Sequence, residues 1–310
     1  MKAAWDWHFP RKTNEDEDAL VAFVAELGFD TMVLNNPSTY IIKKAHDTGL
    51  RVVAVISPHA DAQFADDHPE CLQKMRPYED GMYSALDSSV GETASRIAHR
   101  WFPYFQHGNL FCYSHEASIL ALKKRSSELL ESADGIALDG FGFKNHYACF
   151  CGRCIERHGG QEPAYIAEMS EFDLIEISRQ LRDHAKNQKK DAVVTNHVWP
   201  PYDPNPYYGA KLYLDYCTQT ISWFYQPVWS LERVRFEAAE HKRLEIPGRN
   251  KFVPFIGLHD EPSNKRDAQR VAQEVDIALE YGDGSLVVCT LQTPKNDDEI
   301  RRAITEALHR

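Results

Sequence analysis

The sequence contains no apolar run that approaches the roughly 20 residues needed to cross a bilayer. Glycine and proline contribute only 16 residues each to a chain of 310, which excludes collagen-like and low-complexity organisation. Basic residues are also in the minority, since 35 Lys and Arg face 46 Asp and Glu for a net charge of −11. A nucleic-acid backbone or an anionic membrane requires a cationic face, so we expect neither as a partner.

Cysteine is sparse as well, and the N-terminus lacks the apolar core of a signal peptide. Seven cysteines are too few for a scaffold built on disulfides. The first residues, MKAAWDWHF, reach Trp, Asp and His within a few positions and are typical of a first strand. We therefore expect a cytoplasmic protein. The composition itself is that of a globular protein, with 43% hydrophobic and 26% charged residues.

Apolar runs of strand length alternate with longer amphipathic segments along the chain. The predicted strands lie at 2–8, 31–35, 51–57, 135–141, 192–198, 220–226, 252–258 and 285–291. The predicted helices lie at 17–27, 40–48, 116–132, 168–188, about 207–217, 229–244, 265–281 and 297–309. Eight strand–helix pairs match the size of a (β/α)8 TIM barrel. No GxGxxG or P-loop motif follows a strand, which disfavours a doubly wound sheet. We predict an α/β fold, a single (β/α)8 barrel domain over residues 1–310.

The stretch 58–115, between the third predicted strand and the third helix, is far longer than an ordinary βα loop. It is rich in aromatic and histidine residues. Long insertions on this side of a barrel usually help to form a substrate pocket. We therefore expect the insertion to fold over the C-terminal mouth of the barrel and to contribute side chains to the pocket.

Polar residues gather at the C-terminal ends of the predicted strands, where barrels carry their chemistry. Any one of them could be a rim residue or a helix cap, but so many are hard to obtain from packing alone. Asp139 follows the apolar run IAL, where burial would select an aliphatic residue, and such violations are expected at functional sites. The candidates for substrate binding are Asp6, His8, Asn35, His59, His197, Trp199, Tyr225 and His259.

The strongest single segment is ADGIALDGFGFKNHYACFCGRC, residues 133–154. It resembles the fourth strand and following loop of glycoside-hydrolase-like barrels, particularly the proteins called hypothetical glycosyl hydrolases. In those proteins an Asp-ended strand is followed by a C-x-C-x-x-C loop, and Asp134, Gly135, Ile136 and Asp139 match that strand. The resemblance implies that Asp139 is the nucleophile, as in amylase-like retaining barrels. The fifth predicted strand departs from that pattern, because it ends TNHVW without a Glu.

Glycoside hydrolysis needs a second carboxyl group, which in a retaining enzyme lies about 5–5.5 Å from the first. The seventh predicted strand ends HDEP and supplies Asp260 and Glu261 across the mouth from Asp139. Strand pleating favours only one of the two facing inward. We lean to Glu261 for its longer side chain, and Asp6 is a second choice. The sequence thus predicts a glycosidase for a small oligosaccharide or glycoside, with no cofactor required for catalysis.

Cys149, Cys151 and Cys154 place three thiols on one loop, and His146 or His158 could supply a fourth ligand. A structural Zn²⁺ prefers such a tetrahedral sulfur and nitrogen set. The spacing is tighter than that of paired C-x-x-C knuckles, so free packing thiols stay an open alternative. A disulfide is disfavoured in a reducing compartment.

Two other function classes use the same residues. Metal-dependent barrel hydrolases and sugar isomerases take imidazole and carboxylate ligands from several strand ends. Against them, the first strand reads D-W-H rather than H-x-H. A non-catalytic carbohydrate-binding barrel would keep the aromatic residues but would need neither Asp139 nor a carboxylate on the seventh strand. The sequence leaves the oligomeric state open.

Overall fold

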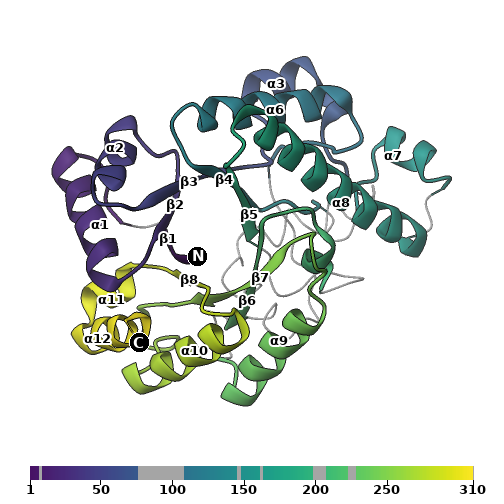
Figure 1. Ribbon diagram of the computed structural model, residues 1–310. Helices are drawn as coiled ribbons and strands as arrows, with labels where there is room; N and C mark the ends of the chain where they lie inside the picture. The colour runs from purple at the N-terminus through teal and green to yellow at the C-terminus, as the bar shows by residue number, and fades with distance from the viewer. Residues whose placement is uncertain are drawn as a thin grey trace.

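The computed structural model describes residues 1–6, 9–75, 108–144, 148–160, 163–197, 207–222 and 228–309. Its eight parallel strands are β1 (Lys2–Asp6), β2 (Thr31–Asn35), β3 (Arg51–Ile56), β4 (Gly135–Asp139), β5 (Val193–His197), β6 (Tyr216–Ser222), β7 (Lys251–Gly257) and β8 (Leu286–Cys289). They are hydrogen-bonded in the order β5-β4-β3-β2-β1-β8-β7-β6. Because this order joins the first strand to the last, the sheet curls into a nearly closed barrel (Figure 1). The predicted (β/α)8 fold is confirmed.

Helices alternate with the strands and cover the outside of the barrel (Figure 1). The longer ones are α1 (Asn14–Leu27), α2 (Thr39–Asp47), α6 (Glu116–Leu130), α8 (Pro163–Gln188), α9 (Leu231–Arg243), α10 (Ala268–Tyr281) and α12 (Asp298–Leu308). Short helices are α3 (Ala62–Asp67), α7 (Gly152–Arg157) and α11 (Gln292–Asn296), with 3-10 turns η1 (Pro69–Cys71) and η3 (Tyr208–Lys211). The local sequence sets their ends: Thr13 and Asp16 form a capping box before α1, and left-handed Gly28 ends it.

The sixth strand and the helix before it differ from the prediction. The strand begins at Tyr216 rather than at residue 220, and the helix expected at 207–217 is only the short turn η3. The strand YCTQTIS is buried from its second residue onward, but its threonines and glutamine do not form an apolar run. The aromatic residues at 223–225 have strand propensity, and for that reason the sequence predicted the strand at 220–226. The end of β6 therefore moves to Ser222, and Tyr225 lies outside the described residues.

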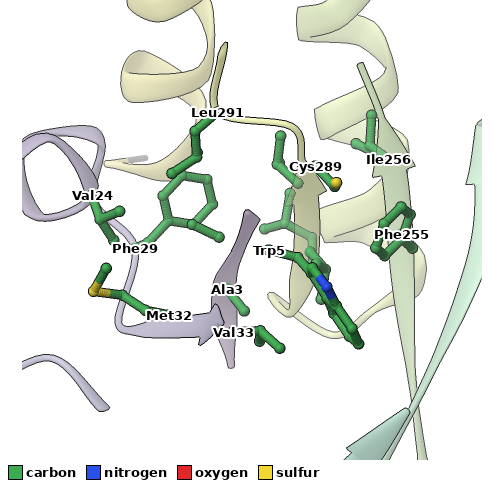
Figure 2. Packing of buried hydrophobic residues seen from close by; sticks show 14 of the residues in the cluster. Ala3, Trp5, Val24, Phe29, Met32, Val33, Phe255, Ile256, Cys289 and Leu291 are labelled. Carbon is green, nitrogen blue, oxygen red and sulfur yellow. The ribbon is translucent and has the colours of Figure 1, made fainter. Parts of the chain in front are cut away.

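Aromatic rings fill the interior of the barrel. Trp5 of β1 is fully buried, and its ring lies edge-on to Phe255 of β7 at a centroid distance of 6.1 Å. Figure 2 shows these two side chains close to Cys289 at the end of β8. His197 of β5 contacts both rings. Because β1, β5 and β7 are not neighbours in the sheet, these three side chains can meet only inside the barrel.

An aspartate before every second strand ties the N-terminal face together as far as β6. Asp30, before β2, accepts a backbone N–H of β1 at 3.0 Å. Asp134, before β4, accepts a backbone N–H of β3 at 2.8 Å. Asp215, before β6, accepts a backbone N–H of β5 at 2.8 Å. We call these three residues the clasp aspartates, since each joins the start of one strand to the start of its predecessor.

The described ends of the insertion pair with each other beside β3. Two antiparallel bridges join its outgoing limb to its returning limb, His59 to Leu110 and Leu72 to Phe111. Residues 76–107 lie outside the described residues, so the position of the insertion over the mouth stays a prediction, as does the single-domain organisation. In the described part of the chain, none of the helices is long and apolar enough to span a membrane.

Candidate active site

Asp139 is the last residue of β4, at the C-terminal end of the barrel. The preceding residues of the strand are all buried, whereas the Asp139 side chain is 23% exposed. Its Oδ1 lies 3.4 Å from Nδ1 of His197, at the same level of the adjacent strand. Gly140 follows in the left-handed region with φ 69°, so the chain turns away directly after the carboxylate. Asp139 therefore stands at the mouth with one imidazole partner.

His197 lies inside the barrel, with no exposed side-chain surface. Its ring stacks on Phe255 at a centroid distance of 4.1 Å and an interplanar angle of 20°, and Trp5 lies 5.6 Å away. Its Nε2 is 3.2 Å from Oγ1 of Thr220 on β6. Substrate binding by His197 stays a prediction, and the contact that the geometry establishes is with Asp139.

Asp6, at the end of β1, is buried and bonds to the segments that follow β1 and β8. Its carboxylate accepts the backbone N–H of Phe9 at 2.7 Å and that of Leu291 at 3.4 Å. Burial raises the pKa of the Cys289 thiol well above its ordinary value, and the negative charges of Asp6 and Asp139 raise it further. The carboxylates of Asp6 on β1 and Asp139 on β4 thus both disfavour the thiolate form of Cys289.

The two carboxylates after β7 differ in their surroundings. Asp260 is half-buried, and its Oδ2 accepts a hydrogen bond of 2.6 Å from the Asn296 amide. Its Oδ1 is buried with no hydrogen-bond partner among the described residues. Glu261 is exposed, and its backbone carbonyl accepts N–H groups from Asn264 and Lys265, both at 2.8 Å. The main chain of Glu261 therefore starts a turn. Of the two carboxylates, Asp260 is the more buried.

The other predicted site residues lie at separate points of the rim. Asn35, at the end of β2, lines a cavity of about 290 Å³ together with Ser57 and Arg125. His59 is exposed, and its Nδ1 lies 2.9 Å from Oγ of Ser57. His259 is half-buried, and its Nδ1 accepts the N–H of the second residue after it at 3.1 Å. Four predicted residues lie outside the described residues: His8, His146, Trp199 and Tyr225.

A buried guanidinium at the ends of β6 and β7 escaped the sequence analysis. Arg266 donates to Oγ of Ser222 at 2.6 Å and to the carbonyl of Gly257. Its Nη1 lies 3.4 Å from Oε2 of Glu274, which is fully buried on α10. Burial lowers the pKa of Arg266, and Glu274 opposes that shift. In sequence Arg266 sits in a polar stretch before a helix, and such stretches are usually exposed.

Four buried thiols come together from the segments that follow β3 and β4. Cys149, Cys151 and Cys154 lie within 4.8 Å of one another, as predicted from their spacing. The fourth member is Cys112, on the returning limb of the insertion, with Sγ–Sγ distances of 3.8, 3.7 and 3.5 Å to the other three. A tetrahedral zinc with Zn–S bonds of about 2.3 Å would place its sulfurs about 3.8 Å apart. The described thiols are therefore spaced for one metal ion.

His158, one of the two histidines expected as a fourth ligand, has a different partner. Its Nε2 lies 3.2 Å from Asp173 of α8, and both side chains are buried. Asp173 also pairs with Arg157 at 2.7 Å and accepts a hydrogen bond from Ser114 at 3.1 Å. Burial raises the pKa of Asp173 in spite of these contacts. Cys112 takes the place expected for His158, because the insertion returns over the C-x-C-x-x-C loop.

The histidines at the strand ends are not gathered around a common point in the described part of the chain. Metal-competent groups there comprise the four-cysteine cluster, the trio His68, Glu70 and Cys71, and the trio Cys154, His158 and Asp173. His59, His197 and His259 belong to none of them. The described residues therefore give no support to a catalytic metal held by these three histidines.

Comparisons with known proteins find similarity at the level of the fold. No protein-family model and no curated protein sequence matches the chain. Among solved structures, the glycoside hydrolase domain of PgaB (BpsB) from Bordetella bronchiseptica has a TM-score of 0.68 at 11% identity, over 99% of this chain and 98% of that one. A beta-galactosidase from the haloarchaeon Halorubrum lacusprofundi has a TM-score of 0.65 at 13% identity, over 100% and 58%.

A third similar structure is the alpha-L-fucosidase isoenzyme 2 from Paenibacillus thiaminolyticus, with a TM-score of 0.57 at 12% identity. The comparison covers 99% of this chain, which spans 48% of the fucosidase. The chain thus has a glycoside-hydrolase-like (β/α)8 barrel, and at these identities the likeness concerns the fold.

Proposed function

We propose that the protein is a glycoside hydrolase in which Asp139 attacks the anomeric carbon of a small oligosaccharide or glycoside. The observation that carries this proposal is a half-buried carboxylate at the C-terminal end of β4, in a barrel of glycoside-hydrolase type, with an imidazole 3.4 Å away. Such a carboxylate is open to a substrate on one side and held by the protein on the other. Access for a substrate together with a fixed position supports a nucleophilic role for this carboxylate.

A carboxyl group after β7 supplies the proton to the leaving oxygen in this proposal. The surroundings favour Asp260 over Glu261, because Asp260 is half-buried and one of its oxygens is held by the Asn296 amide, whereas Glu261 is exposed. The favoured mechanism retains configuration, with Asp139 forming the glycosyl-enzyme intermediate and Asp260 acting as acid and then as base.

The test uses purified protein and a panel of aryl glycosides and short oligosaccharides. With a substrate in hand, Asp139→Ala should lower kcat by at least about 10³-fold, and azide should restore part of the activity with inversion at the anomeric carbon. The matched control is Asp191→Asn, an exposed residue at the N-terminal side of β5, which should act like the native protein. Near-native turnover in Asp139→Ala would refute the assignment.

A barrel that binds sugars without cleaving them is distinguished by the same panel. Binding of a sugar by calorimetry, with no turnover of any glycoside by the native protein, would favour the binding module. Loss of activity with EDTA and its recovery with added metal would favour a metal-dependent hydrolase or isomerase.

We propose a structural role for the four-cysteine cluster, with Cys112, Cys149, Cys151 and Cys154 holding one Zn²⁺. The buried thiols, spaced 3.5–3.8 Å from Cys112, carry this proposal. Four thiolates close the coordination sphere, so the metal would stabilise the fold and leave no position for a substrate. Elemental analysis should find about one zinc per chain, and Cys112→Ser should lower both the zinc content and the melting temperature. A chain that is folded and free of zinc after purification without chelators contradicts this role.

A further inference from the structure

One pair of neighbouring strands is not joined by a regular ladder. Seven pairs carry parallel ladders, whereas β5 and β6, both inside the described part of the chain, are the two ends of the hydrogen-bonded order. At the N-terminal side they are connected by one backbone hydrogen bond of 2.8 Å, which the Asp215 N–H donates to the Val194 carbonyl. Beyond that point, side chains take over the contact between the two strands. We call this boundary the β5–β6 seam.

Three residues of β5 bridge the seam in succession. Thr195 Oγ1 lies 3.0 Å from Thr218 Oγ1, and Asn196 Oδ1 accepts the Thr218 N–H at 3.0 Å. The last bridge is the contact of 3.2 Å between His197 Nε2 and Thr220 Oγ1. Thr195, Thr218 and Thr220 are fully buried. The seam is therefore closed by a row of hydrogen bonds whose outermost member lies beside Asp139.

Two polar contacts of His197 within the described part of the chain favour one tautomer of its ring. A carboxylate has only acceptors, so a favourable contact between Asp139 and Nδ1 requires the proton on Nδ1. In the neutral ring Nε2 is then an acceptor, and the Thr220 hydroxyl donates to it. Stacking on Phe255 holds the plane of the ring. The contact of 3.4 Å is long, as such contacts often are before a substrate binds.

We propose that His197 is the positioning residue of Asp139, that the carboxylate selects the Nδ1–H tautomer, and that the Thr220 hydroxyl, across the β5–β6 seam, holds the ring in place by donating to Nε2. This inference rests on the proposed function for its catalytic consequence, whereas the tautomer itself does not. His197 fixes Asp139 through Oδ1 alone and fixes the direction of the carboxylate before the substrate arrives. Preorganisation of this kind places the attacking oxygen without a rearrangement during the reaction.

The first test needs no substrate. The full chain is labelled with ¹⁵N in its histidine rings, and the His197 signals are assigned through their contacts with Phe255. For the neutral ring we expect the proton on Nδ1. Thr220→Val removes the hydroxyl beside Nε2 and should change the Nε2 chemical shift while the proton stays on Nδ1, and Thr220→Ser, which keeps the hydroxyl, should keep the native spectrum. A native ring whose neutral form carries its proton on Nε2 overturns the proposal whether or not the variants fold.

Thr218→Val is the matched control, because it removes a hydroxyl from the same seam without touching His197. It should lower stability and leave the His197 spectrum unchanged. Equal changes of that spectrum in Thr218→Val and Thr220→Val would reduce the seam to a purely structural role and overturn the inference.

The second test applies once a glycoside is hydrolysed. His197→Gln should lower kcat about 10²-fold with KM nearly unchanged, and Thr220→Val should lower it less. A loss confined to KM overturns the positioning role. The two failures can be told apart: a correct tautomer with no turnover of any glycoside counts against the proposed function, while turnover with the wrong tautomer counts against the positioning of Asp139.

Discussion

At the scale of single residues, the carboxylates at the ends of β4 and β7 meet different environments. Asp139 has an imidazole partner, whereas Asp260 has one oxygen bonded to an amide and one buried without a partner among the described residues. The two carboxyl groups thus differ in the neighbours that orient them, and this difference is what the proposed division of roles uses.

Asp260→Asn and Glu261→Gln form a matched pair of variants, since each replaces a carboxylate by its amide. We expect Asp260→Asn to lower kcat by at least about 10²-fold, because a general acid is lost, and Glu261→Gln to stay close to the native enzyme. Rates on aryl glycosides with good and poor leaving groups provide the measurement. The loss in Asp260→Asn should be greatest with poor leaving groups, and the reverse ranking of the two variants would assign the acid to Glu261.

The sequence carries part of this information but not all of it. The position of Asp139 at the end of a buried strand could be predicted, because a carboxylate after an apolar run departs from the burial pattern. The burial of His197 could not, since the rings that surround it belong to β1 and β7 and meet it only when the barrel closes. Cys112 was equally hidden, since 37 residues separate it from Cys149 and no motif includes it.

At the scale of elements, the start of β4 explains why a glycine follows Asp134. A Cβ on Gly135 would lie 2.1 Å from the carbonyl oxygen of Val193, the first residue of β5. The two strands therefore approach so closely that only glycine fits. Strand β6 was harder to predict from the sequence. Its buried threonines form hydrogen bonds across the seam, but in the sequence they have the composition of a polar segment.

Gly135→Ala should destabilise the protein by about 1–3 kcal/mol, because one of the two strands has to move. Gly152→Ala is the control, since a Cβ there meets nothing within 4 Å. Chemical denaturation measures both, and the denaturation midpoint should fall for the first variant alone. An unchanged midpoint for Gly135→Ala would mean that the strands separate at no cost.

At the scale of the whole molecule, two of the clasp aspartates, Asp30 and Asp134, link stability to acid pH. Burial alone would raise the pKa of Asp134, but hydrogen bonds from Val52 and His46 hold it below its ordinary value. The pKa of Asp30 is lowered in the same way, since hydrogen bonds from Thr31 and Lys2 outweigh its burial. A carboxyl with a lowered pKa in the folded state contributes stability above its unfolded pKa of about 3.9 and loses that contribution below it.

We therefore expect stability to fall as the pH drops below about 4. Asp134→Asn should be less stable than the native protein at neutral pH and should lose less stability on acidification. Urea midpoints measured from neutral pH down to the acid limb provide the test, with Asp191→Asn as a control that should follow the native curve. Parallel curves for Asp134→Asn and the native protein would contradict the linkage.

The β5–β6 seam also gives the closed ring a place to open. Backbone amide protons exchange with solvent when the structure opens locally, and segments held by fewer backbone hydrogen bonds open at a lower cost in free energy. Deuterium uptake in the native state should therefore be faster in β5 and β6 than in β3 and β4, whose shared ladder is regular. Equal uptake in the two pairs would contradict this expectation. A barrel that unzips at this boundary becomes an open horseshoe, and the same event would separate Thr220 from His197 and release the partner of Asp139.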